Sequence, residues 1–183
     1  ITLSTAGITP RLEQLIEATK VHIAVSLHNP FHDQRAEIMP VEKAYPIREL
    51  TDMLRRHDFS GQRRLSFEYI LMEGLNDTAA HIRELRRLLN GLNCRINIIR
   101  FHRIPDSPYF SPPRQKMEAF RDRLTAGGIH TTIRASRGED IQAACGLLST
   151  AEAMRRAEQR RSQDHDTAEG DTHHPTTKQT TER

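Results

Sequence analysis

Apolar residues follow two alternating patterns along the first 134 positions of the chain. Short runs rich in β-branched and other apolar residues predict strands, and apolar residues three or four positions apart predict helices between them. The predicted strands are residues 1–4, 21–27, 65–71, 95–101 and 129–134. Strict alternation of strands and helices favours right-handed βαβ units, and therefore an α/β fold with a parallel sheet.

Four amphipathic helices are predicted between these strands. Their apolar stripes are Leu12, Leu15 and Ile16; Ile47, Leu50 and Leu54; Ile82, Leu85, Leu88 and Leu89; and Met117, Phe120 and Leu124. Pro10 fits the start of the first helix, the turn 74–77 caps the third, and Gly127-Gly128 ends the fourth. Residues 28–46 are polar and punctuated by prolines, which predicts a long loop with one helical turn.

The C-terminal residues differ from the rest of the chain. We expect a folded region over residues 1–150 and a terminal helix over residues 151–161. From residue 162 to 183 the apolar content falls to a single alanine, Ala168. Such a segment cannot bury enough surface to offset the entropy lost on ordering, so a disordered polar tail is expected there.

Composition and charge limit the kind of protein this chain can be, but they do not identify a binding partner. The 27 Lys and Arg against 24 Asp and Glu leave a net charge of only +3, which is no signature of a polyanion-binding protein. Arginine dominates the cations, which suits phosphate contacts but also follows from codon bias, and we favour codon bias. No apolar stretch reaches membrane-spanning length and no secretory leader is visible, so a cytoplasmic protein with no membrane partner is expected. The first residue is Ile1, inside a predicted strand, so a fragment is also expected.

Ligands of parallel α/β proteins bind at the C-terminal ends of the strands. This rule selects residues 4–7, 26–29, 68–77 and 101–102. His28 and His32 have a metal-ligand spacing, but Asn29-Pro30 breaks any helix between them, so a metal site is disfavoured. Glu68 interrupts an apolar strand and needs a partner if buried, and we expect an ion pair with a neighbouring arginine.

The two cysteines have different surroundings. Cys145 is flanked by Ala143, Ala144 and Gly146, which leaves the sulfur sterically open, and Arg134 and Arg137 could lower the pKa of its thiol or hold a phosphate nearby. We therefore favour a reactive role for Cys145 over a structural one. Cys94 precedes a predicted strand, and a buried small side chain is the better interpretation there.

Several of these segments together resemble one known family. The matching segments are Leu3-Ser4-Thr5 with Gly7, residues 24–28, residues 35–40, residues 67–69, residues 74–77, residues 97–99, and residues 137–146 from Arg137-Gly138-Glu139-Asp140-Ile141 to Ala143-Ala144-Cys145-Gly146. In this order and spacing the chain resembles the C-terminal portion of the radical-SAM adenine C2-methyltransferases, the RlmN and Cfr family. The resemblance covers residues 1 to about 150 and does not extend to the tail.

The resemblance implies a fold, a reaction and site residues. The fold is the C-terminal part of a partial (β/α) TIM-like barrel, with its first strands missing. Ser4, Ser26, Leu27, His28 and His102 match positions that contact S-adenosylmethionine, although many members have Asn where this chain has His102. Cys145 matches the cysteine that carries the methyl group. The implied substrates are 23S ribosomal RNA and possibly transfer RNA, and the implied full-length enzyme is a monomer.

The resemblance also implies what lies outside the chain. The family's CxxxCxxC motif for a [4Fe-4S] cluster, its glycine-rich cofactor loop, its second reactive cysteine and its proposed general base all precede the position of Ser4. The two cysteines of this chain cannot hold such a cluster. We therefore expect a methyltransferase fragment that is inactive by itself. The alternative is a cluster-free module that binds RNA or the cofactor.

Overall fold

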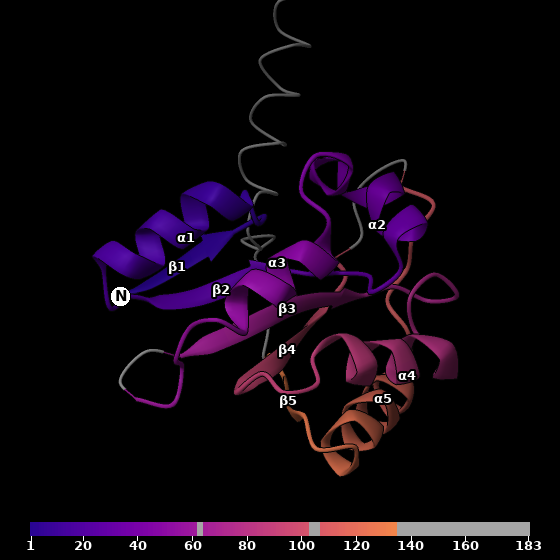
Figure 1. Cartoon of the computed structure of the whole chain (residues 1–183). Coiled ribbons are helices and arrows are strands. Elements are labelled where there is room, and N and C mark those ends of the chain that lie inside the picture. The colour runs from indigo at the N-terminus through magenta and orange to yellow at the C-terminus, as the bar shows by residue number, and fades with distance from the viewer. Residues whose placement is uncertain (62–63, 103–106, 135–183) are drawn as a thin grey trace, which may run out of the picture. The chain divides into compact units, whose positions relative to one another are not determined.

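Five parallel strands form one sheet in which spatial order follows chain order (Figure 1). The computed structural model describes residues 1–61, 64–102 and 107–134. The strands are β1 (Thr2–Thr5), β2 (His22–Ser26), β3 (Leu65–Leu71), β4 (Cys94–Arg100) and β5 (His130–Ile133). Sequential order with all strands parallel is the arrangement of a (β/α) barrel segment, and it confirms the predicted fold class.

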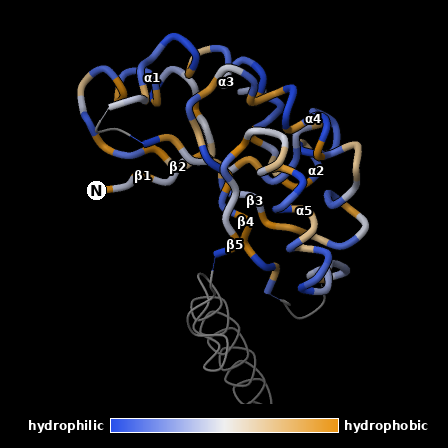
Figure 2. Tube along the Cα trace, turned by 90° about the horizontal axis from the view of Figure 1, so that it is seen from below, coloured by the Kyte–Doolittle hydropathy of each residue, from blue (hydrophilic) through white to orange (hydrophobic). Residues whose placement is uncertain are grey.

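The helices connect successive strands and lie on one side of the sheet (Figures 1 and 2). They are α1 (Thr9–Ala18), α2 (His32–Ile38), the 3₁₀ helix η1 (Pro40–Lys43), α3 (Ile47–Leu54), α4 (Ala79–Leu88) and α5 (Arg114–Ala126). Because right-handed crossovers in sequential order all pass over the same side, the other side of the sheet carries none of these helices.

The hydrophobic core lies between the sheet and this helical layer. Alternate strand residues point into it, among them Val25, Phe67 and Ile98, each with no exposed surface. Figure 2 shows the matching alternation of hydrophobic and hydrophilic residues along the helices. Tyr69 stacks on Phe120 of α5, with ring centroids 5.8 Å apart. Full burial of each such side chain contributes about 1.5–3 kcal/mol, so this face holds the fold together.

The predicted elements occur with small shifts in their ends, and one prediction is wrong. Residues 28–46 contain two helices, α2 and η1, where the proline-rich pattern predicted a loop with one turn. The N-cap of α4 is Thr78, one residue after the turn predicted to cap it. Asn76, in that turn, is instead fully buried and bonded to other elements.

Several predictions fall on residues outside the described part of the chain. These are the segment carrying Cys145, the helix expected over residues 151–161 and the tail from residue 162. Within the described residues, no helix has the length and apolarity needed to cross a bilayer.

Candidate functional site

The sheet face opposite the core is polar and hollowed. It lines a cavity of about 580 Å³. Its lining polar side chains come from four strands and the residues after them, and include Ser4, Ser26, His28, Ser66, Glu68 and Asn97. Three arginines, Arg64, Arg95 and Arg134, line the same cavity. Strand residues alternate between two faces, so the same segments that build the core also place these polar groups together.

One row of polar side chains crosses this face laterally. In the strand register Ser26 lies beside Glu68, Glu68 beside Asn97, and Asn97 beside Thr132. Thr132 Oγ1 donates to Asn97 Oδ1 at 3.0 Å, and Asn97 Nδ2 donates to Glu68 Oε1 at 2.7 Å. Ser66 Oγ is a second donor to the same Glu68 oxygen at 3.3 Å. The row therefore fixes the orientation of the Glu68 carboxylate.

The other oxygen of Glu68 has no such donor. Oε2 is buried and accepts no hydrogen bond from the described residues. The cation that faces it is Arg134, with Nη1 at 3.9 Å and a side chain that is 67% exposed. The ion pair predicted for Glu68 is therefore a long contact, and the amide of Asn97 is its main partner. A buried acceptor without a donor costs about 1–3 kcal/mol, so Oε2 is poised to bind one.

His28 presents a neutral imidazole to the cavity. Its Nδ1 accepts a hydrogen bond from the Ile70 amide at 3.1 Å, which leaves the proton on Nε2. Burial, assisted by the nearby charge of Arg35, lowers the pKa of His28 from 6.5 to about 4. At neutral pH His28 is thus a hydrogen-bond donor without charge.

The backbone of His28 is held in a conformation that L-residues seldom adopt. Its φ of +56° lies in the left-handed region. Asn76 Nδ2 donates to His28 O at 2.6 Å and to Ile70 O at 2.7 Å, while Asn76 Oδ1 accepts from the Met72 amide at 2.8 Å. The buried Asn76 side chain therefore ties the end of β2 to the end of β3.

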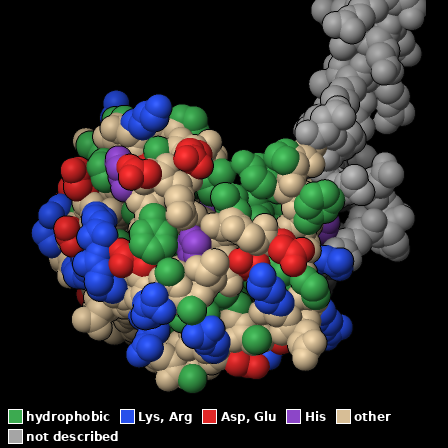
Figure 3. Space-filling model, turned by 90° about the vertical axis from the view of Figure 1, so that its right-hand side faces the viewer, with side chains coloured by type: hydrophobic (Ala, Val, Ile, Leu, Met, Phe, Trp, Pro, Cys, Tyr) green, Lys and Arg blue, Asp and Glu red, His purple; other side chains and the backbone are tan. Residues whose placement is uncertain are grey.

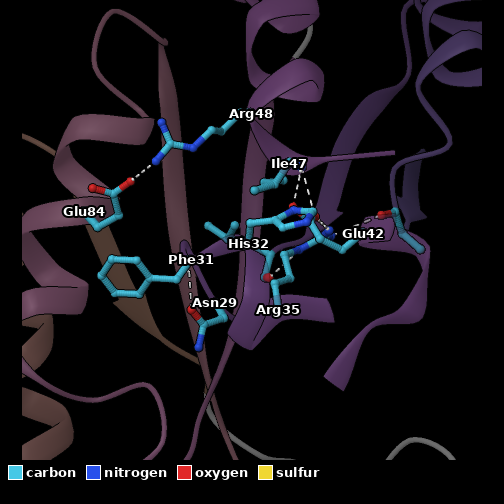
Figure 4. A network of polar contacts seen from close by, with 10 residues as sticks. Asn29, Phe31, His32, Arg35, Glu42, Ile47, Arg48 and Glu84 are labelled. Atoms are coloured by element: carbon cyan, nitrogen blue, oxygen red, sulfur yellow. Dashed lines mark hydrogen bonds and ion pairs between the residues drawn. The ribbon is translucent and has the colours of Figure 1, made fainter. Parts of the chain in front are cut away.

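A buried ion pair supports the same strand ends from the core side (Figure 4). Arg35 is fully buried, and it pairs with Glu42, which is 1% exposed. Arg35 also donates to Ser26 O at 2.8 Å and to Leu27 O at 2.9 Å. Glu42 accepts in turn from the Ile47 amide at 2.9 Å and contacts His32 Nδ1 at 2.9 Å. Sequence reasoning noticed residues 35–40 only through the resemblance and did not identify this pair.

The structure brings together three of the predicted site residues. Ser4, Ser26 and His28 line the cavity, and His102 follows β4 but is not among the lining residues. The side chain of Leu27 is buried in the core, and its amide donates to Glu68 O at 2.9 Å. Cys145 lies outside the described residues.

Cys94 is partly buried, which fits the structural interpretation given to it better than a reactive one. It begins β4, packs against the core, and its thiol pKa is raised to about 12 by burial. A thiol with so high a pKa is a poor nucleophile at neutral pH.

The face seen in Figure 3, which is the right-hand side of Figure 1, carries charges of both signs. Glu84 pairs with Arg48 at 2.8 Å and with Arg87 at 2.6 Å, and Lys116 pairs with Asp77 at 2.6 Å. Because several cations already have carboxylate partners, the excess of arginine does not form a continuous basic surface on the face shown.

Three relatives of the chain share the name RlmN. The chain is 54% identical over 151 residues to the probable dual-specificity RNA methyltransferase RlmN of Bacteroides fragilis, covering 82% of this chain and 44% of that protein. The corresponding protein of Porphyromonas gingivalis is 54% identical over 153 residues, covering 84% and 45%. RlmN of Syntrophus aciditrophicus is 46% identical over 149 residues, covering 81% and 43%. No protein-family model matches the chain.

Solved structures agree with the sequence relatives. A radical SAM methyltransferase from Sphaerobacter thermophilus superposes with a TM-score of 0.74 at 43% identity, covering 80% of this chain and 43% of that one. A domain of pyruvate-formate lyase-activating enzyme from Bacteroides vulgatus shares the fold at 15% identity, with a TM-score of 0.57. The chain spans less than half the length of the curated relatives it matches. In sequence and fold, the chain is therefore similar to a part of proteins named RlmN and to a part of a radical SAM methyltransferase.

Proposed function

We propose that the chain forms the S-adenosylmethionine-binding face and carries the methyl-bearing cysteine of a dual-specificity RNA methyltransferase. The observation that carries this proposal is the convergence of Ser4, Ser26 and His28 on one polar cavity. The family resemblance had assigned all three to cofactor contacts. The substrates proposed for the whole enzyme are adenines of 23S ribosomal RNA and of transfer RNA, in the cytoplasm.

The cavity has the chemistry that the adenosyl group of S-adenosylmethionine requires. Ribose hydroxyls and the adenine amino group are donors, and Glu68 Oε2 is a buried acceptor without a donor among the described residues. Ring nitrogens are acceptors, and His28 Nε2–H is a donor. Ile70 and Ile99 supply apolar surface beside these groups. The residues present therefore fit this cofactor.

The same test fails for a [4Fe-4S] cluster. Three thiolates close together are needed, and the chain contains only Cys94 and Cys145. The ligands of the family's cluster must come from outside this chain. We therefore assign no step of the reaction to a cluster held here.

The step that this chain's own residues perform is transfer of a methyl group to sulfur. With S-adenosylmethionine bound, the Cys145 thiolate would accept the methyl group: an S–C bond to Cys145 would form as the bond from the methyl carbon to the sulfonium breaks, and the departing thioether would keep that electron pair. Subsequent transfer to C2 of adenine uses radical chemistry that the rest of the enzyme supplies.

Binding of S-adenosylhomocysteine to the 183-residue chain tests the cofactor assignment. Calorimetry should detect one saturable site, and His28→Phe should weaken it about tenfold or more, because phenylalanine keeps a ring of similar size but has no N–H donor for the ligand. His130→Phe is the matched control, since His130 is exposed at the start of β5 and does not line the cavity. Absence of binding, or equal loss in both variants, would contradict the proposal.

A further inference from the structure

Glu68 Oε2 lies in the lining of the cavity and is a buried acceptor without a hydrogen-bond donor among the described residues. Ser66 Oγ and Asn97 Nδ2 both donate to Oε1 of this carboxylate. Thr132 Oγ1 donates to the side chain of Asn97 and so orients it. Oε2 remains buried and without a donor from the described residues. From this geometry we propose that Glu68 Oε2 accepts a hydrogen bond from a ribose hydroxyl of the bound adenosyl group, an inference that rests on the proposed function.

The charges around Glu68 favour a neutral donor over an ammonium group. Arg64, Arg95 and Arg134 line the cavity with Glu68. With three guanidinium groups and one carboxylate, these four side chains carry a net positive charge, which repels a cationic ligand group. A hydroxyl gains the hydrogen bond to the carboxylate without meeting this repulsion.

The position of Glu68 along its strand favours ribose over the adenine ring. Ile70 lies two residues further along β3, and Ile99 is its neighbour in the register of β4. These apolar side chains are the surface on which a planar ring packs. Two residues of strand span about 7 Å, which is comparable to the separation between an adenine ring and the hydroxyls of its ribose.

The row of donors makes glutamine a sharp test at this position. In Glu68→Gln the amide oxygen takes the place of Oε1, because Asn97 Nδ2 and Ser66 Oγ both donate there. The amide nitrogen of the variant side chain then occupies the position of Oε2 and presents a donor to the ligand's donor. The substitution changes one acceptor into a donor with almost no change in shape.

The experiment measures calorimetric affinities of the 183-residue chain for S-adenosylhomocysteine and for its 2′-deoxy and 3′-deoxy analogues. Glu68→Gln should weaken S-adenosylhomocysteine by about 10- to 100-fold. One deoxy analogue should bind the wild-type chain correspondingly weakly, and it should lose no further affinity in the variant. Glu118→Gln, on α5 and outside the cavity, is the matched control and should change affinity less than about threefold.

Each outcome has a distinct meaning. Equal affinity of both proteins for S-adenosylhomocysteine, or equal binding of all three ligands to the wild-type chain, would overturn the role of Glu68 and leave the proposed function standing. Failure of the wild-type chain to bind any of the three ligands would overturn the proposed function itself. The analogue series on the wild-type chain tests the inference even if the variant does not fold.

Discussion

Replacing Arg35 with methionine should be among the most destabilising single changes in this fold. Arg35 has no exposed surface and pairs with Glu42, which is 1% exposed. Arg35→Met leaves that carboxylate buried without its cation and removes donors from Ser26 O and Leu27 O. Removing one partner of a buried pair costs about 3–5 kcal/mol, a large share of the roughly 5–15 kcal/mol typical of a domain.

Equilibrium unfolding in urea, followed by circular dichroism, measures this loss. Arg48→Met is the matched control, because Arg48 also pairs with a carboxylate, Glu84 at 2.8 Å, but its side chain is 52% exposed. We expect the control to cost less than about 1 kcal/mol. A loss in Arg35→Met no larger than in Arg48→Met would refute the reasoning.

A double-mutant cycle separates the pair from the other contacts of each residue. Glu42→Leu alone should also destabilise, because Glu42 accepts from the Ile47 amide at the start of α3. The double variant should lose less than the sum of the two single losses, with a coupling of about 1–3 kcal/mol. Strict additivity would mean that the charges do not stabilise each other.

Three further predictions are checked by unfolding or by chemical labelling of cysteine. Because the pKa of His28 is lowered from 6.5 to about 4, the unfolded chain binds more protons between these values, so stability is fully present above pH 6.5 and falls by up to about 3 kcal/mol towards pH 4. His28→Gln should flatten this part of the profile, and an unchanged slope would contradict the assignment. Asn76→Ala should cost about 2–4 kcal/mol in urea unfolding, since three buried backbone groups lose their partner, and a loss below about 1 kcal/mol would be inconsistent with that role. Cys94, whose pKa is raised to about 12, should react with iodoacetamide at pH 8 at least about 100-fold more slowly in the folded chain than in urea, judged by mass spectrometry of its peptide. Equal rates would contradict the raised pKa.

The sheet was predictable because its pattern is local. Residues 65–71 were predicted as a strand and form β3 with the same ends, since large apolar residues occupy every second position, with Ser66 and Glu68 between the first three. The C-terminal ends of the strands were also identified, because parallel sheets place their ligands there. That rule selected Ser26 and His28 from the sequence alone.

The supporting polar groups were not predictable because their partners are distant in sequence. Asn76 was interpreted as part of a helix cap, the usual place for an asparagine, yet it bonds to the backbone of His28 from another strand end. Arg35 and Glu42 lie in a stretch whose prolines and charges are typical of a solvated loop. Nothing local distinguishes a buried charge pair from two exposed charges, since only the tertiary contact removes them from water.

Adenine methylation by a reconstituted enzyme tests the central claim most directly. A chimera joins the part of Bacteroides fragilis RlmN that this chain does not cover to the 183 residues of this chain, and mass spectrometry measures methylated adenine in its RNA substrate. Cys145→Ala should abolish the product, because the methyl group has no sulfur to occupy, whereas Cys94→Ala should retain it at reduced protein stability. Undiminished methylation by the Cys145→Ala enzyme would contradict the account.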